Sequence, residues 1–311
     1  MTKALVIGRR RVGRKIGPTV HEVERQLIAV GWTVETAVVY HKRQLRKRAA
    51  KAVKDDVDIA VAVGGDGAVF QVVNAIAGSA TMLGIIPKGT GNLLAGNLDI
   101  PTQVDKAVQV LLEGTPREID LGRVAIEGAD RDFAVACGVG FDANVMDATD
   151  PNQKRRWGKL AYVAAAVREG RKIREVTHEI TIDGRTTTTA AAQVFIANFG
   201  RIGSLAEPRR RVIPDDGRFD VFVVRAGGPV EGVLAGWTAL NQRTLGEADN
   251  GRVLRRRARE VTVKSKPRQL VETDGTVIGR TPISVSIRPK ALRVMAPARS
   301  STAKRDAAKA G

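Results

Sequence analysis

Two glycine-rich segments, each directly after an apolar run, contain the residues of this chain best suited to chemistry. Gly64-Gly65-Asp66-Gly67 follows the run at 57–63, and Lys88-Gly89-Thr90-Gly91-Asn92 follows the run at 82–86. Glycines at the carboxyl end of a strand let backbone N–H groups approach a phosphate closely, and a helix that begins there adds its positive end. The pattern predicts phosphate binding at both segments. The alternative at the first segment is a tight turn in which Asp66 caps the helix.

Three arginines extend the expected phosphate site. Arg9, Arg10 and Arg11 follow the apolar run at 3–7, so we expect phosphate contact at the same edge of a parallel sheet, with a solvated surface as the alternative. The chain has no Gly-x-x-x-x-Gly-Lys-Ser/Thr segment, which excludes a P-loop. A single cysteine, Cys137, excludes an internal disulfide and a cysteine-based zinc site, and its apolar surroundings favour a small core residue.

The elements that must position these residues alternate between strand and helix in the first part of the chain. Apolar runs predict strands at 3–7, 33–40, 57–63 and 82–86. Apolar residues at helical spacing predict a helix at 18–30, the segment 41–54 reads as a basic helix, and further helices follow each glycine turn. This alternation predicts an α/β domain over residues 1–122, with a doubly wound parallel sheet and helices on both faces.

The second part of the chain is rich in strands. They are predicted at 117–126, 132–139, 176–197, 219–224, 253–264, 268–272 and 282–295, with Asp183-Gly184 and Asp274-Gly275 as hairpin turns. Two helices are predicted at 157–168 and 229–244. We therefore expect residues 123–297 to form a β-rich antiparallel sandwich domain, and residues 298–311 to form a disordered basic tail.

Positive charge is concentrated at the two ends of the chain. Residues 1–54 carry 14 basic and 3 acidic side chains (+11), residues 251–311 carry 16 and 4 (+12), and residues 55–250 carry 21 and 26 (−5). Such an excess attracts nucleotide phosphates, anionic lipid surfaces or nucleic acid, and charge alone does not choose among them. No apolar run approaches the roughly 20 residues of a membrane span. We expect a cytoplasmic protein that associates with membranes only peripherally.

An ordered set of motifs resembles the catalytic domain of the diacylglycerol kinase and sphingosine kinase superfamily, in particular its soluble bacterial lipid kinases. The set comprises Gly64-Gly65-Asp66-Gly67, Val72-Val73-Asn74, Gly89-Thr90-Gly91-Asn92-Leu93, Ile119-Asp120-Leu121-Gly122, Gly138-Val139-Gly140-Phe141-Asp142, Pro214-Asp215-Asp216-Gly217-Arg218 and Asp274-Gly275. The resemblance covers roughly residues 3–297. It implies a nucleotide-binding domain similar to phosphofructokinase and NAD kinases, a lipid-binding β domain, and an active site in the cleft between them.

The resemblance also implies roles for individual residues. Those expected to bind ATP are Arg9, Arg10, Arg11, Gly64, Gly65, Asp66, Gly67, Ala68, Gly89, Thr90, Gly91 and Asn92. Asp66 and Asp120 would order a catalytic Mg²⁺. A structural Mg²⁺ would be held by Asp216 with the carbonyls of Ile213 and Arg218. A base near Asp274 would take the proton of a lipid hydroxyl, whose oxygen attacks the γ-phosphate of ATP. The implied partners are ATP, a lipid substrate and an anionic membrane surface, without nucleic acid; a homodimer stays open.

The sequence departs from the family most pointedly at Thr276, which stands where the family has a glutamate that acts as the base. A threonine hydroxyl cannot act as that base unaided, so either Asp274 or Asp66 takes the role, or activity is weak or lost. Three functions remain. We favour an ATP-dependent kinase of diacylglycerol or a related lipid. The alternatives are a pseudokinase that binds nucleotide or lipid, and an NAD kinase, whose downstream Asn-Glu pair is absent.

Overall fold

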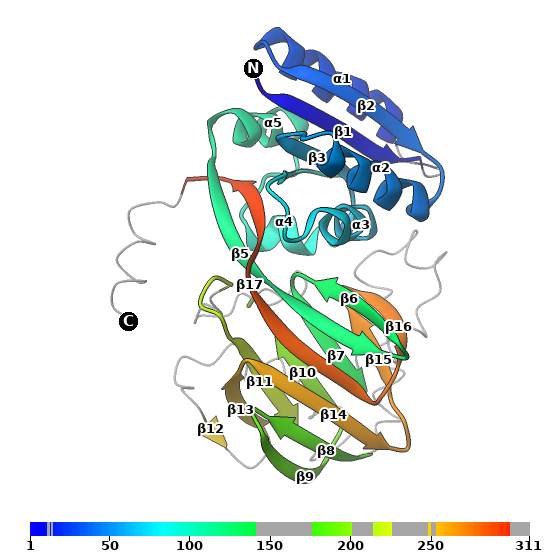
Figure 1. Cartoon of the computed structure of the whole chain (residues 1–311), viewed down its shortest axis with the longest axis vertical. Coiled ribbons are helices and arrows are strands. Elements are labelled where there is room, and N and C mark those ends of the chain that lie inside the picture. Colours follow the sequence, from blue (N-terminus) through cyan, green and yellow to red (C-terminus); the bar gives the residue numbers. More distant parts are fainter. Residues whose placement is uncertain are drawn as a thin grey trace. The chain divides into compact units, whose positions relative to one another are not determined.

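The computed structural model describes residues 1–10, 13, 15–140, 176–200, 214–225, 248–249 and 253–298 of the 311-residue chain (Figure 1). The chain forms two compact units. Unit 1 comprises Met1–Lys88, Ala95–Glu118 and Arg293–Gly311, and unit 2 comprises Gly89–Leu94 and Ile119–Leu292. The domain boundaries expected from the sequence, 1–122 and 123–297, stay a prediction, because these units are defined by contacts and not by independent folding.

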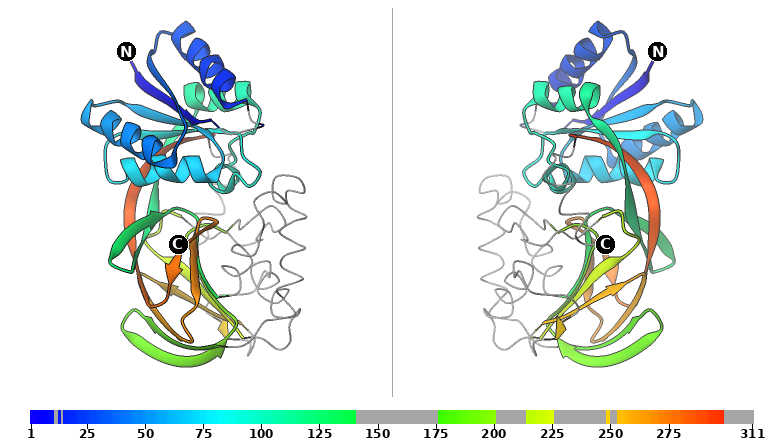
Figure 2. Two further views of the ribbon diagram at one scale, coloured as in Figure 1. Left: turned by 90° about the vertical axis from the view of Figure 1, so that its right-hand side faces the viewer. Right: turned by 90° about the vertical axis from the view of Figure 1, so that its left-hand side faces the viewer.

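Unit 1 is built on a parallel sheet with the strand order β2-β1-β3-β4. Its strands are β1 (Lys3–Arg9), β2 (Thr33–Val39), β3 (Ile59–Gly64) and β4 (Met82–Pro87). Its helices are α1 (Ile16–Ala29), α2 (Lys42–Lys54), α3 (Asp66–Ile76) and α5 (Val104–Glu113), and a short α4 (Leu93–Asn97) follows the second glycine turn. Because α1 packs against α5 and α2 against α3, helices cover both faces of the sheet (Figure 2). This confirms the predicted doubly wound α/β domain.

The residue types in these strands and helices follow from which of their positions are buried. Every residue of β3 is buried, because the sheet is covered on both faces, and the strand therefore lacks alternating polar positions. α1 buries Val20, Val23 and Leu27, which lie about one helical turn apart on one face.

Unit 2 is an antiparallel β-sandwich of two sheets, as predicted. One sheet contains β6 (Ala129–Phe133), β5 (Thr115–Ile126), β17 (Ile283–Ala296), β14 (Glu260–Lys266), β8 (Val176–Ile182) and β9 (Arg185–Ala191), in this order. The other contains β12 (Ala248–Asp249), β13 (Val253–Ala258), β11 (Phe219–Val224), β10 (Gln193–Ala197), β7 (Ala136–Gly140), β15 (Leu270–Thr273) and β16 (Thr276–Arg280). The long strand β17 also returns the chain to unit 1, where Val294 pairs with Leu83 of β4.

Three predicted strand runs are divided between the two sheets in the structure. The run at 176–197 forms β8 and β9 in one sheet and β10 in the other. The run at 132–139 forms the end of β6 and most of β7, and the run at 253–264 forms β13 and part of β14; in each case the two strands belong to different sheets. An apolar run indicates that a segment is buried, but it does not indicate which strands the segment pairs with. The sheet to which each part belongs therefore could not be predicted from the run. The hairpin turns Asp183-Gly184 and Asp274-Gly275 are confirmed, since all four residues have the positive φ that type I′ turns need.

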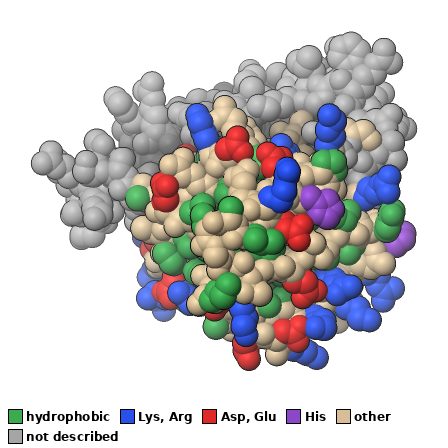
Figure 3. Space-filling model, turned by 90° about the horizontal axis from the view of Figure 1, so that it is seen from above, with side chains coloured by type: hydrophobic (Ala, Val, Ile, Leu, Met, Phe, Trp, Pro, Cys, Tyr) green, Lys and Arg blue, Asp and Glu red, His purple; other side chains and the backbone are tan. Residues whose placement is uncertain are grey.

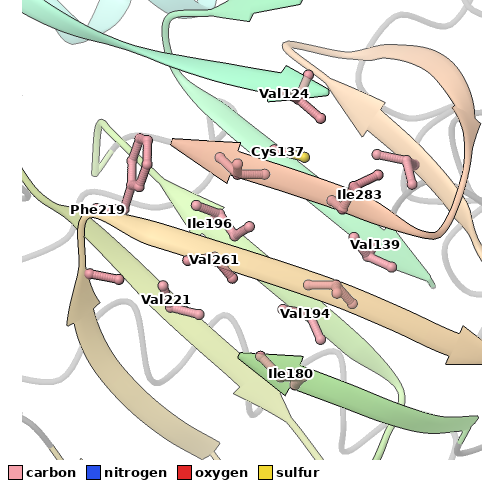
Figure 4. Close-up of a cluster of buried hydrophobic side chains, with 14 of the residues drawn as sticks. Val124, Cys137, Val139, Ile180, Val194, Ile196, Phe219, Val221, Val261 and Ile283 are labelled. Carbon is pink, nitrogen blue, oxygen red and sulfur yellow. The ribbon is translucent and has the colours of Figure 1, made fainter. Parts of the chain in front are cut away.

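The core of unit 2 lies between its two sheets (Figure 4). Val261 and Ile283 come from one sheet and Ile196 and Val221 from the other, and all four belong to one buried cluster. Cys137 is fully buried in this cluster, which confirms a core residue. Burial raises the pKa of its thiol well above the usual value, and nearby carboxylates add to the rise.

Several predicted features lie outside the described residues. They are the helices at 157–168 and 229–244, Arg11, Ile213, and residues 299–311 of the tail. Among the residues that the structure describes, no helix combines the length and apolar character needed to cross a bilayer.

Candidate functional site

The carboxyl edge of the parallel sheet collects the predicted nucleotide residues of unit 1. The chain runs from β1 to β2 on one side and continues with β3 on the other, so the connections diverge between β1 and β3. Ligands of doubly wound sheets bind beside the strand ends at such a point. Arg9 ends β1 and Arg10 follows it, while Gly64 ends β3. The topology therefore brings these arginines and the first glycine turn to the same end of the sheet.

The first glycine turn joins β3 directly to α3. Gly64 has a φ of +159°, and a Cβ at this position would lie 2.9 Å from the Cβ of Ala68, so a larger residue is strained there. The Gly65 carbonyl accepts the amides of Ala68 (2.8 Å) and Val69 (3.2 Å), and Asp66 lies in the first turn of the helix. The positive end of α3 thus lies at the carboxyl edge of the sheet, where it can bind a phosphate.

Lys42 is a candidate that the sequence analysis missed and that the packing of α2 against α3 reveals. Its Cε and Nζ atoms lie 3.8 and 3.9 Å from the position that a Cβ on Gly67 would take. A capping box fixes the start of α2, since the Gln44 side chain accepts the amides of Tyr40 (3.1 Å) and His41 (3.0 Å). An ammonium group here adds positive charge beside the N-terminal turn of α3. In the sequence, nothing local distinguishes this lysine from the other cations of α2.

Arg10 and Tyr40 form a second group at the same edge of the sheet. The Arg10 amide donates to the Val39 carbonyl (2.8 Å). Its guanidinium donates to the Tyr40 hydroxyl (3.4 Å) and lies 5.9 Å from the centroid of the tyrosine ring. Tyr40 is 61% exposed. An exposed aromatic ring held beside a cation is suited to stack on a nucleotide base.

The second glycine turn is held by its own asparagine. The Gly89 amide donates to Asn92 Oδ1 (2.8 Å), and Asn92 Nδ2 donates to the Gly89 carbonyl (3.2 Å). Thr90 and Gly91, between them, are exposed. Within unit 1, the amide of Lys88 donates to the Gly64 carbonyl (2.8 Å), which links the end of β4 to the first glycine turn. These contacts give Asn92 a turn-forming role, and leave its predicted role in nucleotide binding untested.

Asp274, a predicted catalytic residue, is held by backbone amides in unit 2. It is 6% exposed, and its carboxylate accepts the amides of Ala134 (2.8 Å), Val135 (2.8 Å) and Ala136 (3.0 Å). Thr276 lies exposed at the start of β16. These contacts indicate that Asp274 joins the β15–β16 hairpin to the start of β7. Its role as a base stays a prediction.

Glu272 is a buried carboxylate that the sequence analysis did not single out. It is 3% exposed and accepts the Gly275 amide (2.8 Å), so it closes the same hairpin turn as Asp274. Its only signal in the sequence is its place two residues before Asp274, at the end of a predicted strand.

Asp120 is a buried junction in unit 2. It is 1% exposed, and its two carboxylate oxygens accept the amides of Gly217 and Lys290, each at 2.7 Å. Its own amide donates to the Pro214 carbonyl (2.7 Å), and its carbonyl accepts Asn198 Nδ2 (2.7 Å). Asp120 therefore connects β5, β17 and the turn at 214–218, and its expected link to a catalytic Mg²⁺ stays a prediction.

Asp216 is held by an arginine. Its carboxylate forms an ion pair with Arg257 and accepts the Arg218 amide (3.1 Å). Burial raises the pKa of Asp216, and Arg257 and the Arg218 amide oppose this rise. In the described part of the chain, no group of three His, Cys, Asp or Glu side chains is arranged to hold a metal ion. Arg257 therefore contacts the carboxylate at which a structural Mg²⁺ is expected, and the predicted role of Asp216 in metal binding stays a prediction.

Asp66 fits a catalytic Mg²⁺ better. It is partly exposed at the start of α3, at the edge of the sheet where the phosphates are expected. Mg²⁺ in kinases is held by one or two carboxylates together with substrate phosphates and water. One carboxylate beside a phosphate site meets that requirement.

Comparisons with known proteins agree with the fold. The model of the diacylglycerol kinase catalytic domain matches residues 3–124, and that of the YegS C-terminal NAD kinase beta sandwich-like domain matches residues 135–296. Together with the α/β unit and the sandwich, these matches define a two-domain protein of the lipid kinase class. The chain belongs to the diacylglycerol kinase and YegS-like lipid kinase family.

Individual relatives support this assignment. An uncharacterized protein of Synechocystis sp. is 33% identical over 244 residues, which is 78% of this chain and 55% of that protein, so the chain spans about half of that relative. A diacylglycerol kinase of Mycobacterium tuberculosis is 30% identical over 256 residues, 80% of each chain. Two crystal structures from Bacillus anthracis str. Sterne, one described as a diacylglycerol kinase, have TM-scores of 0.77 and 0.71 at 21% and 19% identity. They cover 94% of this chain and 96% of each of theirs, and they show the fold.

Proposed function

We propose that this protein is an ATP-dependent lipid kinase that transfers the γ-phosphate of ATP to a hydroxyl of diacylglycerol or a related lipid. The observation that carries the proposal is the glycine turn at the positive end of α3, with Lys42 beside it. The lipid substrate is inferred from the family, since the relative from Mycobacterium tuberculosis is named diacylglycerol kinase.

In this proposal, unit 1 binds ATP. Lys42 and the backbone amides of the first glycine turn bind phosphate oxygens. Arg10 and Tyr40 bind the adenine base of ATP. Asp66 would hold Mg²⁺, which when bound neutralises charge that develops on the phosphates. Phosphoryl transfer passes through a loose transition state, so positioning and positive charge from these residues account for most of the catalysis.

In this proposal, the step that limits the rate is removal of the proton from the lipid hydroxyl. Thr276 cannot serve as the base. Asp274 already accepts three backbone amides, and Asp66 would hold Mg²⁺, so neither of these two candidate carboxylates is well placed to accept the proton. General-base catalysis typically contributes about 10²–10⁴-fold in rate. We therefore expect slow but measurable turnover. The same observations favour, as a second candidate, a pseudokinase that binds nucleotide without transferring phosphate.

We also propose that α2 binds anionic membranes. The helix buries Leu45, Ala49 and Ala52, and its other side carries Lys42, Arg43, Arg46, Lys47, Arg48, Lys51 and Lys54. Within the described residues, Arg48 forms an ion pair with Glu35 and Lys51 forms one with Asp55. Lys42 also has an interaction partner. Lysine and arginine side chains gather along one side of the face in Figure 3. Each cation near an anionic surface contributes about 1 kcal/mol, so binding to anionic vesicles should weaken as salt rises.

Labelled ATP, Mg²⁺ and a panel of hydroxylated lipids test the proposed activity. Wild-type protein should label a lipid, Asp66→Asn should abolish labelling, and Lys42→Gln should raise the KM for ATP. The matched control is Lys106→Gln, an exposed lysine on α5, which should behave as wild type. If ATP raises the Tm and no lipid is labelled, the pseudokinase is correct. If ATP neither binds nor is consumed, both proposals are wrong.

A further inference from the structure

We infer that Arg257 takes the place of a structural metal ion in unit 2, so that the acidic turn at 214–218 is held without Mg²⁺. The family resemblance assigns a cation to Asp216, and the structure has the guanidinium of Arg257 on that carboxylate. The inference concerns the stability of unit 2 and does not depend on the proposed kinase activity.

The turn brings negative charges close together. Asp216 interacts electrostatically with Asp220 and Asp120. Asp220 and Asp120 are 5% and 1% exposed, so water cannot compensate their charges. Carboxylates that are removed from water must be paired or hydrogen-bonded, and a cluster of them needs a cation.

Two arginines of β13 provide that positive charge. β13 runs antiparallel to β11, with Arg257 opposite Asp220 and Arg255 opposite Phe222. Residues two apart on a strand share a face, so both arginines lie on the side of Asp220. Arg255 donates from Nε (2.8 Å) and Nη2 (2.6 Å) to Asp220, and Arg257 pairs with Asp216.

Backbone amides supply the remaining contacts of the turn. The Gly217 amide donates to Asp120 (2.7 Å), the Arg218 amide donates to Asp216 (3.1 Å), and the Pro214 carbonyl accepts the amide of Asp120 (2.7 Å). These bonds define the turn without a metal. Mg²⁺ requires a near-octahedral shell of oxygens at about 2.0–2.1 Å, and a guanidinium on Asp216 supplies no oxygen. Mg²⁺ and Arg257 therefore compete for the same carboxylate.

Thermal unfolding without nucleotide tests this inference. The Tm of the wild-type protein should be unchanged by EDTA and by millimolar MgCl₂. Arg257→Gln should lower the Tm by about 1–2 °C, the shift expected when a chain of this size loses a partly exposed ion pair. MgCl₂ should restore part of that loss, because Asp216 becomes available to the metal.

Two further variants complete the experiment. Arg256→Gln is the matched control, because Arg256 lies opposite Val221 on the other face of β13, and its Tm should not respond to MgCl₂. Arg257→Lys keeps the positive charge and should stay indifferent to EDTA, which keeps the inference testable if Arg257→Gln does not fold. A wild-type Tm that falls in EDTA and recovers with Mg²⁺ would overturn the inference, as would an Arg257→Gln variant whose Tm ignores Mg²⁺.

Discussion

The substitution Asp274→Asn tests whether the carboxylate of Asp274 has a structural or a catalytic role. Asp274 occupies the first position of its hairpin turn with a φ of +48°, a conformation that asparagine also adopts readily. The substitution therefore leaves the backbone unstrained and changes only the charge and one acceptor oxygen. That oxygen, Oδ2, accepts the amide of Ala134, while Oδ1 accepts the amides of Val135 and Ala136.

The magnitude follows from these three bonds. An asparagine NH₂ in the place of Oδ2 would face the Ala134 amide, so one bond to a charged group, worth about 1.5–3 kcal/mol, is lost and a buried donor is left unpaired. The bonds to Val135 and Ala136 remain but lose the charge that makes such bonds roughly twice as strong as neutral ones. We expect the free energy of unfolding to fall by about 3–5 kcal/mol.

Urea denaturation followed by circular dichroism measures this change, and a lipid phosphorylation assay is run on the same samples. Thr276→Ala is the control, because Thr276 is exposed in the same hairpin and should change stability by at most about 0.5 kcal/mol. An Asp274→Asn variant that keeps the wild-type urea midpoint and loses phosphotransfer would refute this reasoning and identify Asp274 as the base.

Three other predictions test the fold and the site. Gly122→Ala should destabilise the protein by about 1–3 kcal/mol, because its Cβ would overlap the ring of Phe133, whereas Gly17→Ala on α1, with no atom within 4 Å, should be neutral or stabilising in the same urea titration. Burial lowers the pKa of His178 from its usual 6.5, so the protein should lose stability as pH falls below 6.5 by up to about 1.4 kcal/mol per pH unit, and His178→Gln should remove this part of the dependence. Gly65→Val should abolish the rise in Tm caused by Mg-ATP, because its side chain blocks the approach of phosphate to the turn; an unchanged rise would remove the first glycine turn from the site.

Only part of the candidate site could be predicted from the sequence. The glycine turns were found because glycine has a local meaning: it permits positive φ and close approach of the backbone. Lys42 was missed because the sequence does not distinguish one lysine on a polar helix face from another. The packing of α2 against α3 places Lys42 beside the first glycine turn. The division of the run at 132–139 between β6 and β7 was missed for a similar reason, since no glycine, proline or charged residue marks the break between the two strands.

The local features of this protein follow directly from its sequence. Apolar periodicity specified the strands of unit 1 and most strands of unit 2, and Asp-Gly pairs specified two hairpins, because these signals act over a few residues. The roles of the acidic residues, in contrast, depend on contacts between segments that are distant in the sequence. Asp274 meets the amide of Ala134 across 140 positions of sequence, and Asp216 meets Arg257 across 41. Such contacts depend on which strands pair, and strand pairing is a property of the whole fold.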